Sequence, residues 1–271
     1  MQRSEFIDLM KEAAEQHGKV VIHEVAKASG HYLGMRIELD GVPVPVVNLD
    51  MLYERYLETD DIEECTDFIH ELLGKEIETP CDMTALADWE VAKKLLFLRM
   101  FGNVVDGVCR CVADIYQVPY LQLADDGSAV AQVTPQLLDT WGISVDEVFA
   151  QAERNQESLR PAVVLNLSAL LDGDEGNPLY IVTTSNRAYG ASAILYNGVA
   201  DRLRDALGGD FYIIPASIHE MLVFAKLDED DIPFYTRLIS MINREELADH
   251  DVLSNSLYTY DFEKRSIKKA V

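Results

Sequence analysis

One segment of the chain carries the residue types that bind an anion between a strand and a helix. A predicted strand ends at Thr184 and a predicted helix begins near Ala191, so the loop between them leads to a helix N-terminus, where free backbone N–H groups attract anions. The spacing matches neither a Walker loop nor GxGxxG. The alternative is a plain connector in which Asn186 and Gly190 form turns and Ser192 caps the helix. The candidate ligand residues are Thr184, Ser185, Asn186, Arg187, Gly190 and Ser192.

A second polar cluster, Ser217, His219 and Glu220, has the residue types of a hydrolytic triad. A nucleophile must lie within hydrogen-bond reach of its base, whereas alternate residues of a strand lie about 7 Å apart on one face. Pro215 and Ser217 indicate a bend, so we expect turn hydrogen bonds there in preference to catalysis. A zinc-protease HExxH motif is excluded because Val223 occupies the place of the second histidine.

The cysteines and histidines predict neither a metal site nor a cofactor. The four cysteines have no CxxC spacing, and in a cytoplasmic protein we expect them to be reduced thiols in the core. The N-terminal histidines fit no metal-ligand template. The residues concerned are Cys65, Cys81, Cys109 and Cys111, and His17, His23 and His31.

An acidic stretch covers residues 58 to 78, where nine acidic residues stand against a single base, Lys75. Residues 60 to 73 are predicted to form a helix whose apolar stripe includes Cys65 and Ile69, so we expect its carboxylates to point to solvent. Such a face can imitate a phosphate backbone and dock onto a protein partner with a basic surface. A solvated face that only improves solubility is the alternative. The candidate partner-binding residues are Asp60, Asp61, Glu63, Glu64, Asp67 and Glu71.

The whole chain is acidic, with 47 Asp and Glu against 23 Lys and Arg among 271 residues, a formal net charge of -24. This charge opposes direct binding to nucleic acid or to an anionic membrane. No apolar run approaches the roughly 20 residues of a membrane-spanning helix, and residues 1–17 lack the uninterrupted apolar stretch of a signal peptide. We therefore expect a cytoplasmic protein.

Helices and strands are interspersed without regular alternation, which predicts an α+β fold with mixed, mainly antiparallel sheets and packed amphipathic helices. The predicted helices cover residues 5–17, 60–73, 88–96, 135–141, a segment from 145 onward, 191–207 and 231–243. The predicted strands cover residues 19–26, 31–39, 108–116, 120–124, 129–133, 179–184, 211–215, 221–225 and 256–262, followed by a basic tail.

Apolar periodicity predicts which faces are buried. Residues 31–39 alternate as in a half-buried strand, and residues 191–207 place apolar side chains every four positions, as in one continuous helix. Capping-box spacing at residues 60–63 and 144–147 predicts two further helix starts. The side chains predicted to be buried are Leu33, Met35 and Ile37 on the strand, and Leu195, Val199 and Leu203 on the helix.

The polar stretch DGDEGNP at residues 172–178 is the best candidate for a loop or linker. It would separate an N-terminal α+β region, residues 1–171, from a C-terminal α+β region, residues 179–271. One continuous domain is the alternative.

The segments YIVTTSNRAYGASAILY, FYIIPASIHEMLVF and VLSNSLYTYD make the C-terminal third recognisable. They resemble an uncharacterised bacterial family labelled domain of unknown function 5688, with NLDMLYERYLETDDIEE and ISVDEVFAQAERN as weaker matches. The resemblance implies a soluble protein of Gram-positive anaerobes, often carried near genes of mobile elements. It implies no activity, so no catalytic residues are transferred.

Three classes of function remain. The first is a non-enzymatic acidic interaction protein, of the anti-defence or DNA-mimic kind that mobile elements carry, and it is favoured because acidic residues are abundant while no nucleophile, base and orienting group can be assembled. The second is a small-anion or nucleotide-binding protein that uses residues 179–207. The third is an enzyme of unknown chemistry.

Overall fold

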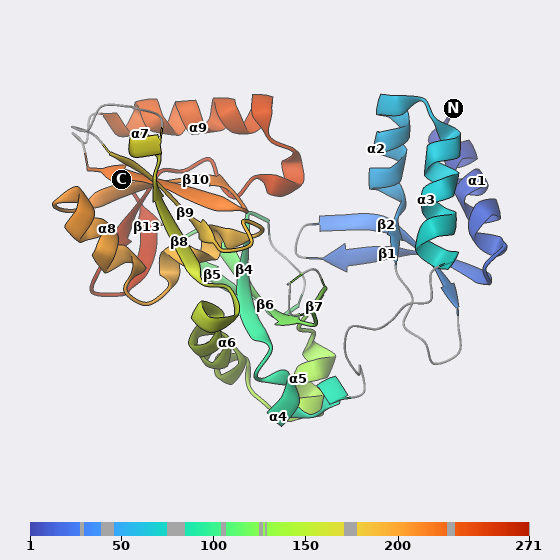
Figure 1. Cartoon of the computed structure of the whole chain (residues 1–271), viewed down its shortest axis with the longest axis horizontal. Coiled ribbons are helices and arrows are strands. Elements are labelled where there is room, and N and C mark those ends of the chain that lie inside the picture. Colours follow the sequence, from blue (N-terminus) through green and yellow to red (C-terminus); the bar gives the residue numbers. More distant parts are fainter. Residues whose placement is uncertain are drawn as a thin grey trace. The chain divides into compact units, whose positions relative to one another are not determined.

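The computed structural model describes residues 1–27, 30–38, 46–74, 85–103, 107–124, 127, 129–170, 178–226 and 231–270. The chain forms two compact units, Met1–Pro80 and Cys81–Val271. Both combine helices with mainly antiparallel sheets, so the predicted α+β class is confirmed (Figure 1).

The first unit packs three helices on a three-stranded sheet of order β1-β2-β3. Its strands pair antiparallel, with Lys27 opposite Gly30. Met35 and Ile37 are buried as predicted, while Leu33 is half-buried. The elements are α1 (Arg3–Glu15), β1 (Lys19–Lys27), β2 (Gly30–Glu38), β3 (Val47–Asn48), α2 (Leu49–Thr59) and α3 (Ile62–Gly74).

The capping box predicted at residues 60–63 is displaced by one residue. Asp60 ends α2 in the left-handed conformation, with φ of 51°. Asp61 caps α3 instead, because its Oδ1 accepts the backbone N–H of Glu64 at 3.0 Å. Helix α2 was not predicted from the sequence, and Asp60 is its C-cap residue.

The second unit begins with a sheet of order β4-β6-β5, with β7 paired to β6. Ala113, with φ of 60°, turns the chain between β5 and β6, so the strand predicted over 108–116 is two strands. The helix predicted over 88–96 is also wrong at its end, since Leu96 begins a fully buried strand. The elements are η1 (Ala85–Ala87), α4 (Trp89–Ala92), β4 (Leu96–Phe101), β5 (Arg110–Val112), β6 (Ile115–Gln122), β7 (Val130–Gln132), α5 (Pro135–Trp141) and α6 (Val145–Leu159).

A six-stranded antiparallel sheet of order β13-β12-β10-β11-β9-β8 forms the rest of the second unit. Helix α9 packs on one face and α8 on the other (Figure 1). The predicted basic tail adds the edge strand β13. The elements are β8 (Ala162–Asn166), α7 (Leu167–Leu170), β9 (Leu179–Thr184), η2 (Gly190–Leu195), α8 (Val199–Leu207), β10 (Phe211–Ser217), β11 (Glu220–Ala225), α9 (Ile232–Glu246), η4 (Asp249–Asp251), β12 (Tyr258–Asp261) and β13 (Ser266–Lys269).

The single helix predicted from 191 to 207 is wrong. A 3₁₀ helix, η2, ends at Leu195, Tyr196 is extended, and Gly198 starts α8 in the left-handed conformation with φ of 77°. The four-residue repeat continues across this break, and Val199 and Leu203 are buried as predicted, while Leu195 is only half-buried. Periodicity therefore identified the buried residues without detecting the break.

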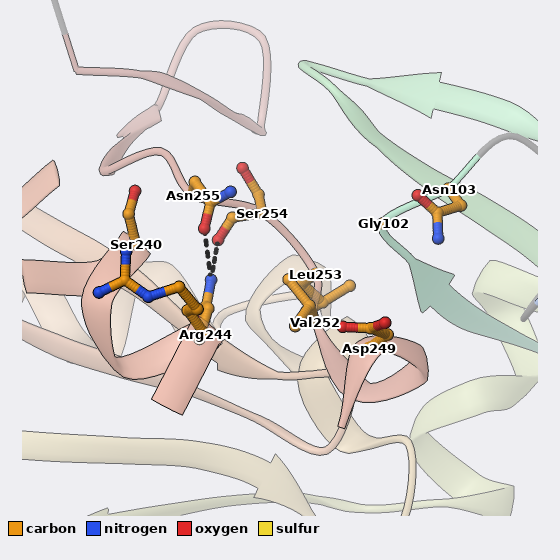
Figure 2. Close-up of a pocket in the computed structure, with 10 residues that line it drawn as sticks. Gly102, Asn103, Ser240, Arg244, Asp249, Val252, Leu253, Ser254 and Asn255 are labelled. Atoms are coloured by element: carbon orange, nitrogen blue, oxygen red, sulfur yellow. Dashed lines mark hydrogen bonds between the residues drawn. The ribbon is translucent and has the colours of Figure 1, made fainter. Parts of the chain in front are cut away.

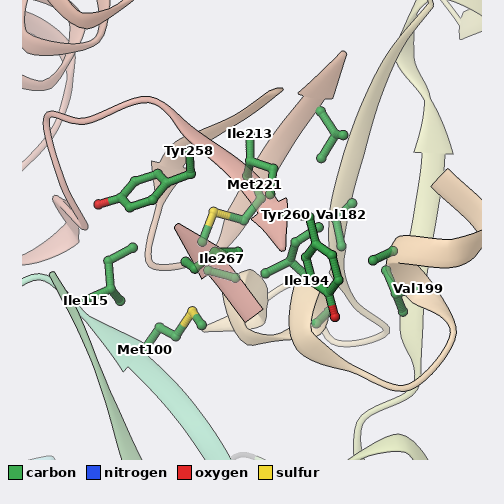
Figure 3. Close-up of a cluster of buried hydrophobic side chains, with 14 of the residues drawn as sticks. Met100, Ile115, Val182, Ile194, Val199, Ile213, Met221, Tyr258, Tyr260 and Ile267 are labelled. Atoms are coloured by element: carbon green, nitrogen blue, oxygen red, sulfur yellow. The ribbon is translucent and has the colours of Figure 1, made fainter. Parts of the chain in front are cut away.

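The core of the second unit joins its two sheets. Met100 and Ile115 of the smaller sheet lie in one cluster with Val182, Ile213 and other side chains of the larger sheet (Figure 3). The strands on either side of residues 172–178, β8 and β9, pair with one another. The division between the two compact units lies at Pro80–Cys81. Residues 172–177 of the predicted linker lie outside the described part of the chain.

A polar clasp also ties the two sheets. The carboxylate of Asp114, in the β5–β6 turn, accepts hydrogen bonds from Tyr258 and Ser254 and pairs with Lys269 Nζ at 2.7 Å. Partial burial acts to raise the pKa of Asp114, but the bonds from Lys269 and Tyr258 outweigh it and hold the pKa below its usual value. Among the described helices, none is long and apolar enough to cross a membrane.

Candidate functional site: a buried arginine cluster beside the 185–189 loop

The loop of residues 185–189, between β9 and η2, is held by its own backbone. The N–H groups of Ser185 and Arg187 donate to Pro161 O and Thr184 O, and the N–H of Ala191 donates to Ile218 O. These amides therefore donate within the protein. They are not available to an anion at this loop.

The loop's side chains divide between the interior and the surface. Thr184 is buried, and its hydroxyl donates to Asn186 Oδ1 at 2.8 Å. Ser185 and Arg187 are exposed, with Arg187 at φ of 52°. Ser192 is buried inside the short η2 and does not cap a helix.

The turn between β10 and β11 clamps this loop. The imidazole Nδ1 of His219 accepts the N–H of Tyr189 at 3.1 Å, and the carbonyl of His219 accepts both Gly190 N–H at 3.0 Å and Thr183 Oγ1 at 2.8 Å. A Cβ atom on Gly190 would lie 2.5 Å from Thr184 N and 2.8 Å from His219 O. Glycine is therefore required by close backbone approach.

The residues of the suspected triad are brought together without triad geometry. The Oγ of Ser217 accepts the backbone N–H of His219 at 3.0 Å, and the two side chains share no hydrogen bond. Because Nδ1 of His219 accepts a hydrogen bond, the neutral ring carries its proton on Nε2, which faces Asp251 Oδ1 at 3.5 Å. Glu220 stands opposite Ser217 in the hairpin register. The histidine positions the loop.

Two arginines that sequence reasoning did not single out lie behind the loop. Arg99, from β4, is 8% exposed, and its guanidinium carbon lies 3.8 Å from the ring centroid of Tyr189 and 4.7 Å from that of Tyr120. Arg160, which ends α6, is 4% exposed and lies 4.0 Å from the ring centroid of Phe97. We call Arg99, Arg160 and these three rings the arginine cluster.

Both guanidinium groups have unused hydrogen-bond donors. Nε of Arg99, and Nε and Nη1 of Arg160, are buried without a hydrogen-bond partner, and neither arginine forms an ion pair in the part of the chain described. The remaining Nη2 of Arg160 donates to Gly127 O at 3.3 Å. A Cβ at Gly127 would lie 2.9 Å from that Nη2 and 3.4 Å from Asn186 Nδ2. The guanidinium group of Arg160 and the side-chain amide of Asn186 therefore both lie close to Gly127.

The electrostatics of the cluster favour an anion. Burial, with the added repulsion of Arg99, lowers the pKa of Arg160 to about 10, and burial also lowers the pKa of Arg99. Burial raises the pKa of Tyr120 and of Tyr196 to about 12, so both phenols are neutral near pH 7. Two positive charges thus remain near each other in a poorly solvated place, which is costly without a counter-ion.

Further buried polar atoms lie around the arginines. The hydroxyls of Ser192 and Tyr196 are buried without a hydrogen-bond partner. Burial raises the pKa of Tyr196, and the positive charge of Arg160 partly opposes that effect. Buried polar groups are usually paired, so these unpaired atoms make the region a candidate site.

A cavity of about 520 Å³ lies elsewhere in the second unit, between the end of β4 and the segment before β12 (Figure 2). Its most buried polar side chain, Asn243, donates to Ser254 O at 3.0 Å and to Asn255 Oδ1 at 2.9 Å. Gly102 lets the chain pass against the Val252 and Leu253 carbonyls. These contacts hold the segment before β12 in place, and the amide nitrogen of Asn243 already donates within the protein.

The acidic helix α3 is placed as expected. Asp60, Asp61, Glu63 and Asp67 are exposed, with Asp61 used as the cap, and Glu64 forms an ion pair with Arg55. Glu71 is exposed as well.

The cysteines and histidines differ in part from expectation. Cys65 is buried as predicted, but Cys109 is half-buried and Cys111 is exposed, because β5 ends at the turn that the predicted strand ran through. Cys81 and the side chain of His31 lie outside the described residues. His17 contacts His70, with Nε2 and Nδ1 at 2.9 Å, and the described residues include no group of three metal-ligating side chains.

Two features of the sequence mark the arginines of this cluster. Arg99 interrupts the apolar run LFLRMF, and Arg160 stands between a helix and a strand, immediately before Pro161. Neither signal shows that the two residues meet, because β4, α6 and the loop come together only through the packing of the second unit.

Comparison with known proteins gives a family of unknown function. No curated protein and no solved structure matches the chain. A family of unknown function, DUF5688, matches residues 111–262, more than half of the chain, including Arg160, the loop and the His219 turn. With that span matched, the protein belongs to the DUF5688 family.

Proposed function

We propose that the protein binds a small anion, carrying a phosphate or carboxylate group, at the arginine cluster. The observation that carries the proposal is the pair Arg99 and Arg160, each more than nine-tenths buried, with unpartnered guanidinium nitrogens and, among the described residues, no carboxylate partner. An isolated buried cation is destabilising, and an anion bound by charge-assisted hydrogen bonds offsets that cost.

The expected contacts come from side chains. Arg160 supplies guanidinium donors, Asn186 supplies its amide Nδ2 beside them, and exposed Arg187 stands next to Asn186 in the loop. Asn186 is held with its oxygen toward Thr184 Oγ1, which leaves the amino group as the free end. The His219 clamp keeps this arrangement in place.

The test is stabilisation by inorganic phosphate, sulfate and AMP, measured as the shift in Tm at constant ionic strength with chloride as the control. A ligand at ten times its Kd should stabilise the wild type by about 1.4 kcal/mol. Arg160→Met should abolish the shift. Arg154→Met is the matched control, because Arg154 is an exposed arginine on the same helix, and it should keep the shift.

The Arg160 variant also has an expected effect without any ligand. Replacing an unpaired buried charge by an apolar side chain of similar length should leave the Tm unchanged or raise it. The proposal is rejected if none of the three anions stabilises the wild type at millimolar concentration, or if Arg160→Met responds as the wild type does.

A second candidate function is docking of the acidic face of α3 onto a basic protein, in the manner of a DNA mimic, as an anti-defence factor would. It is favoured by the exposure of Glu63 and Asp67 on α3 and of Asp60 and Asp61 just before it. Helix α3 buries Cys65 and Ile69 on its other side. Both candidates suit a cytoplasmic, non-enzymatic protein without a direct role in nucleic-acid or membrane binding.

The structure indicates which charge-reversal variants test this second candidate function. Glu63→Lys with Asp67→Lys spares the Asp61 cap and the Glu64 ion pair. If α3 docks, this double variant should lose a salt-sensitive partner captured by the wild type, whereas reversing the exposed Asp205 and Glu246 of the second unit should not. Equal capture by both double variants contradicts docking.

A further inference from the structure

A second cavity of the Cys81–Val271 unit, about 530 Å³ in volume, has the chemistry of a ligand site. Its size falls within the range of small-molecule pockets. It lies between β5 and β6, helix α6, the residues after η2, and the β12–β13 turn, and we call it the glutamine pocket. The lining residues that matter here are Arg110, Gln117, Gln156, Lys264, Arg265 and Cys111.

Two buried carboxamides form its inner wall. Gln156 is 4% exposed, and its Oε1 is buried without a hydrogen-bond partner. Gln117 is 2% exposed, and its Oε1 accepts Nε and Nη2 of Arg110 at 3.0 and 2.6 Å. That orientation leaves the Gln117 amino group as a donor. A ligand would thus meet one acceptor and one donor in the pocket wall.

The charges around the pocket are mainly positive, although the chain as a whole has a net charge of -24. Arg110, Lys264 and Arg265 line it, and Glu153, the one acidic residue among the described lining residues, is already paired with Arg110 at 2.5 Å. Arg265 lies 3.5 Å from Asp201. Lys264 projects from the β12–β13 turn and is exposed. These cations favour a ligand with negative charge.

We propose that the glutamine pocket binds a sugar phosphate. The cations would hold the phosphate, and the carboxamides would exchange hydrogen bonds with sugar hydroxyls, which both donate and accept. The described lining residues include no aromatic ring on which a nucleobase could stack, which favours a sugar over a nucleotide. The site is distinct from the arginine cluster and does not depend on anion binding there.

Cys111 provides a readout confined to this pocket. It is exposed and lines the cavity, so a bound ligand should slow its alkylation by iodoacetamide. Trypsin cleaves after Arg110, which places Cys109 and Cys111 on different peptides for mass spectrometry. The probes are ribose 5-phosphate, glucose 6-phosphate and glycerol 3-phosphate, with inorganic phosphate and glucose for comparison.

At ten times its Kd, a sugar phosphate should slow Cys111 alkylation about tenfold. Gln156→Leu and Lys264→Gln should reduce that protection to less than about twofold at the same concentration. Lys268→Gln should retain it, because Lys268 is in the same hairpin but does not line the pocket. Because Lys264 is exposed, Lys264→Gln should fold normally, and it tests the proposal even if Gln156→Leu does not fold.

The proposal is overturned if none of the three sugar phosphates slows alkylation, or if both pocket variants are protected as well as the wild type. Equal protection by inorganic phosphate alone also overturns it, since the sugar would then make no contact. If Arg160→Met removes the Tm shift caused by phosphate but leaves the protection of Cys111 by a sugar phosphate unchanged, the two sites bind independently.

Discussion

Gly190→Ala should strongly destabilise the second unit. The new Cβ would overlap Thr183 Oγ1 and lie 2.5 Å from Thr184 N and 2.8 Å from His219 O. Two of these atoms belong to the backbone, so the β9 end and the β10–β11 turn must separate. Overpacking of this kind costs about 1 to 3 kcal/mol.

The separation also weakens the clamp on the loop. Three hydrogen bonds converge on His219, from Gly190 N at 3.0 Å, Tyr189 N at 3.1 Å and Thr183 Oγ1 at 2.8 Å. Each contributes about 0.5 to 1.5 kcal/mol. With one or two of them lost, we expect a total loss of about 1.5 to 6 kcal/mol in the free energy of unfolding.

The assay is urea denaturation followed by tryptophan fluorescence. The chain has two tryptophans, Trp89 and Trp141, and both lie in the second unit, so the signal reports on that unit. Gly209→Ala is the matched control, because nothing lies within 4 Å of the added Cβ, and it should change stability by less than about 0.5 kcal/mol. A Gly190→Ala protein as stable as the control would refute the packing described for the loop.

Three further predictions concern the core, the clasp and a helix cap. Leu203→Ala should cost about 2 to 5 kcal/mol by urea denaturation, because Leu203 is fully buried, whereas half-buried Leu207→Ala should cost clearly less. The carboxyl of Asp114 has a lowered pKa in the folded protein, so its contribution to the free energy of unfolding is present above its unfolded pKa of about 4 and is lost as the pH falls through the folded pKa. The stability advantage of the wild type over Asp114→Asn should therefore shrink below about pH 5. A difference that stays constant with pH would contradict this prediction. Ser144→Ala removes the hydroxyl that accepts Glu147 N–H and should lower stability by about 1 kcal/mol, and no measurable loss would contradict the capping box.

Local patterns determined the elements whose stability is local. The alternation of β2 predicted the burial of Met35 and Ile37, and Ser144 with Glu147 predicted the start of α6. These features depend on neighbours two to four residues away, which the sequence displays directly. The anion-binding hypothesis began from the loop of residues 185–189, but the amides of Ser185, Arg187 and Ala191 donate within the protein.

Tertiary packing decided the rest. The break at Gly198 leaves the four-residue repeat of apolar side chains intact, so periodicity could not detect it. Arg99 and Arg160 lie far apart along the chain, and each alone resembles an ordinary basic residue. They lie over the same aromatic ring because the packing of α6 on β4 brings them together. Whether a charge is buried and unpaired depends on every element that surrounds it, and no local pattern in the sequence encodes that.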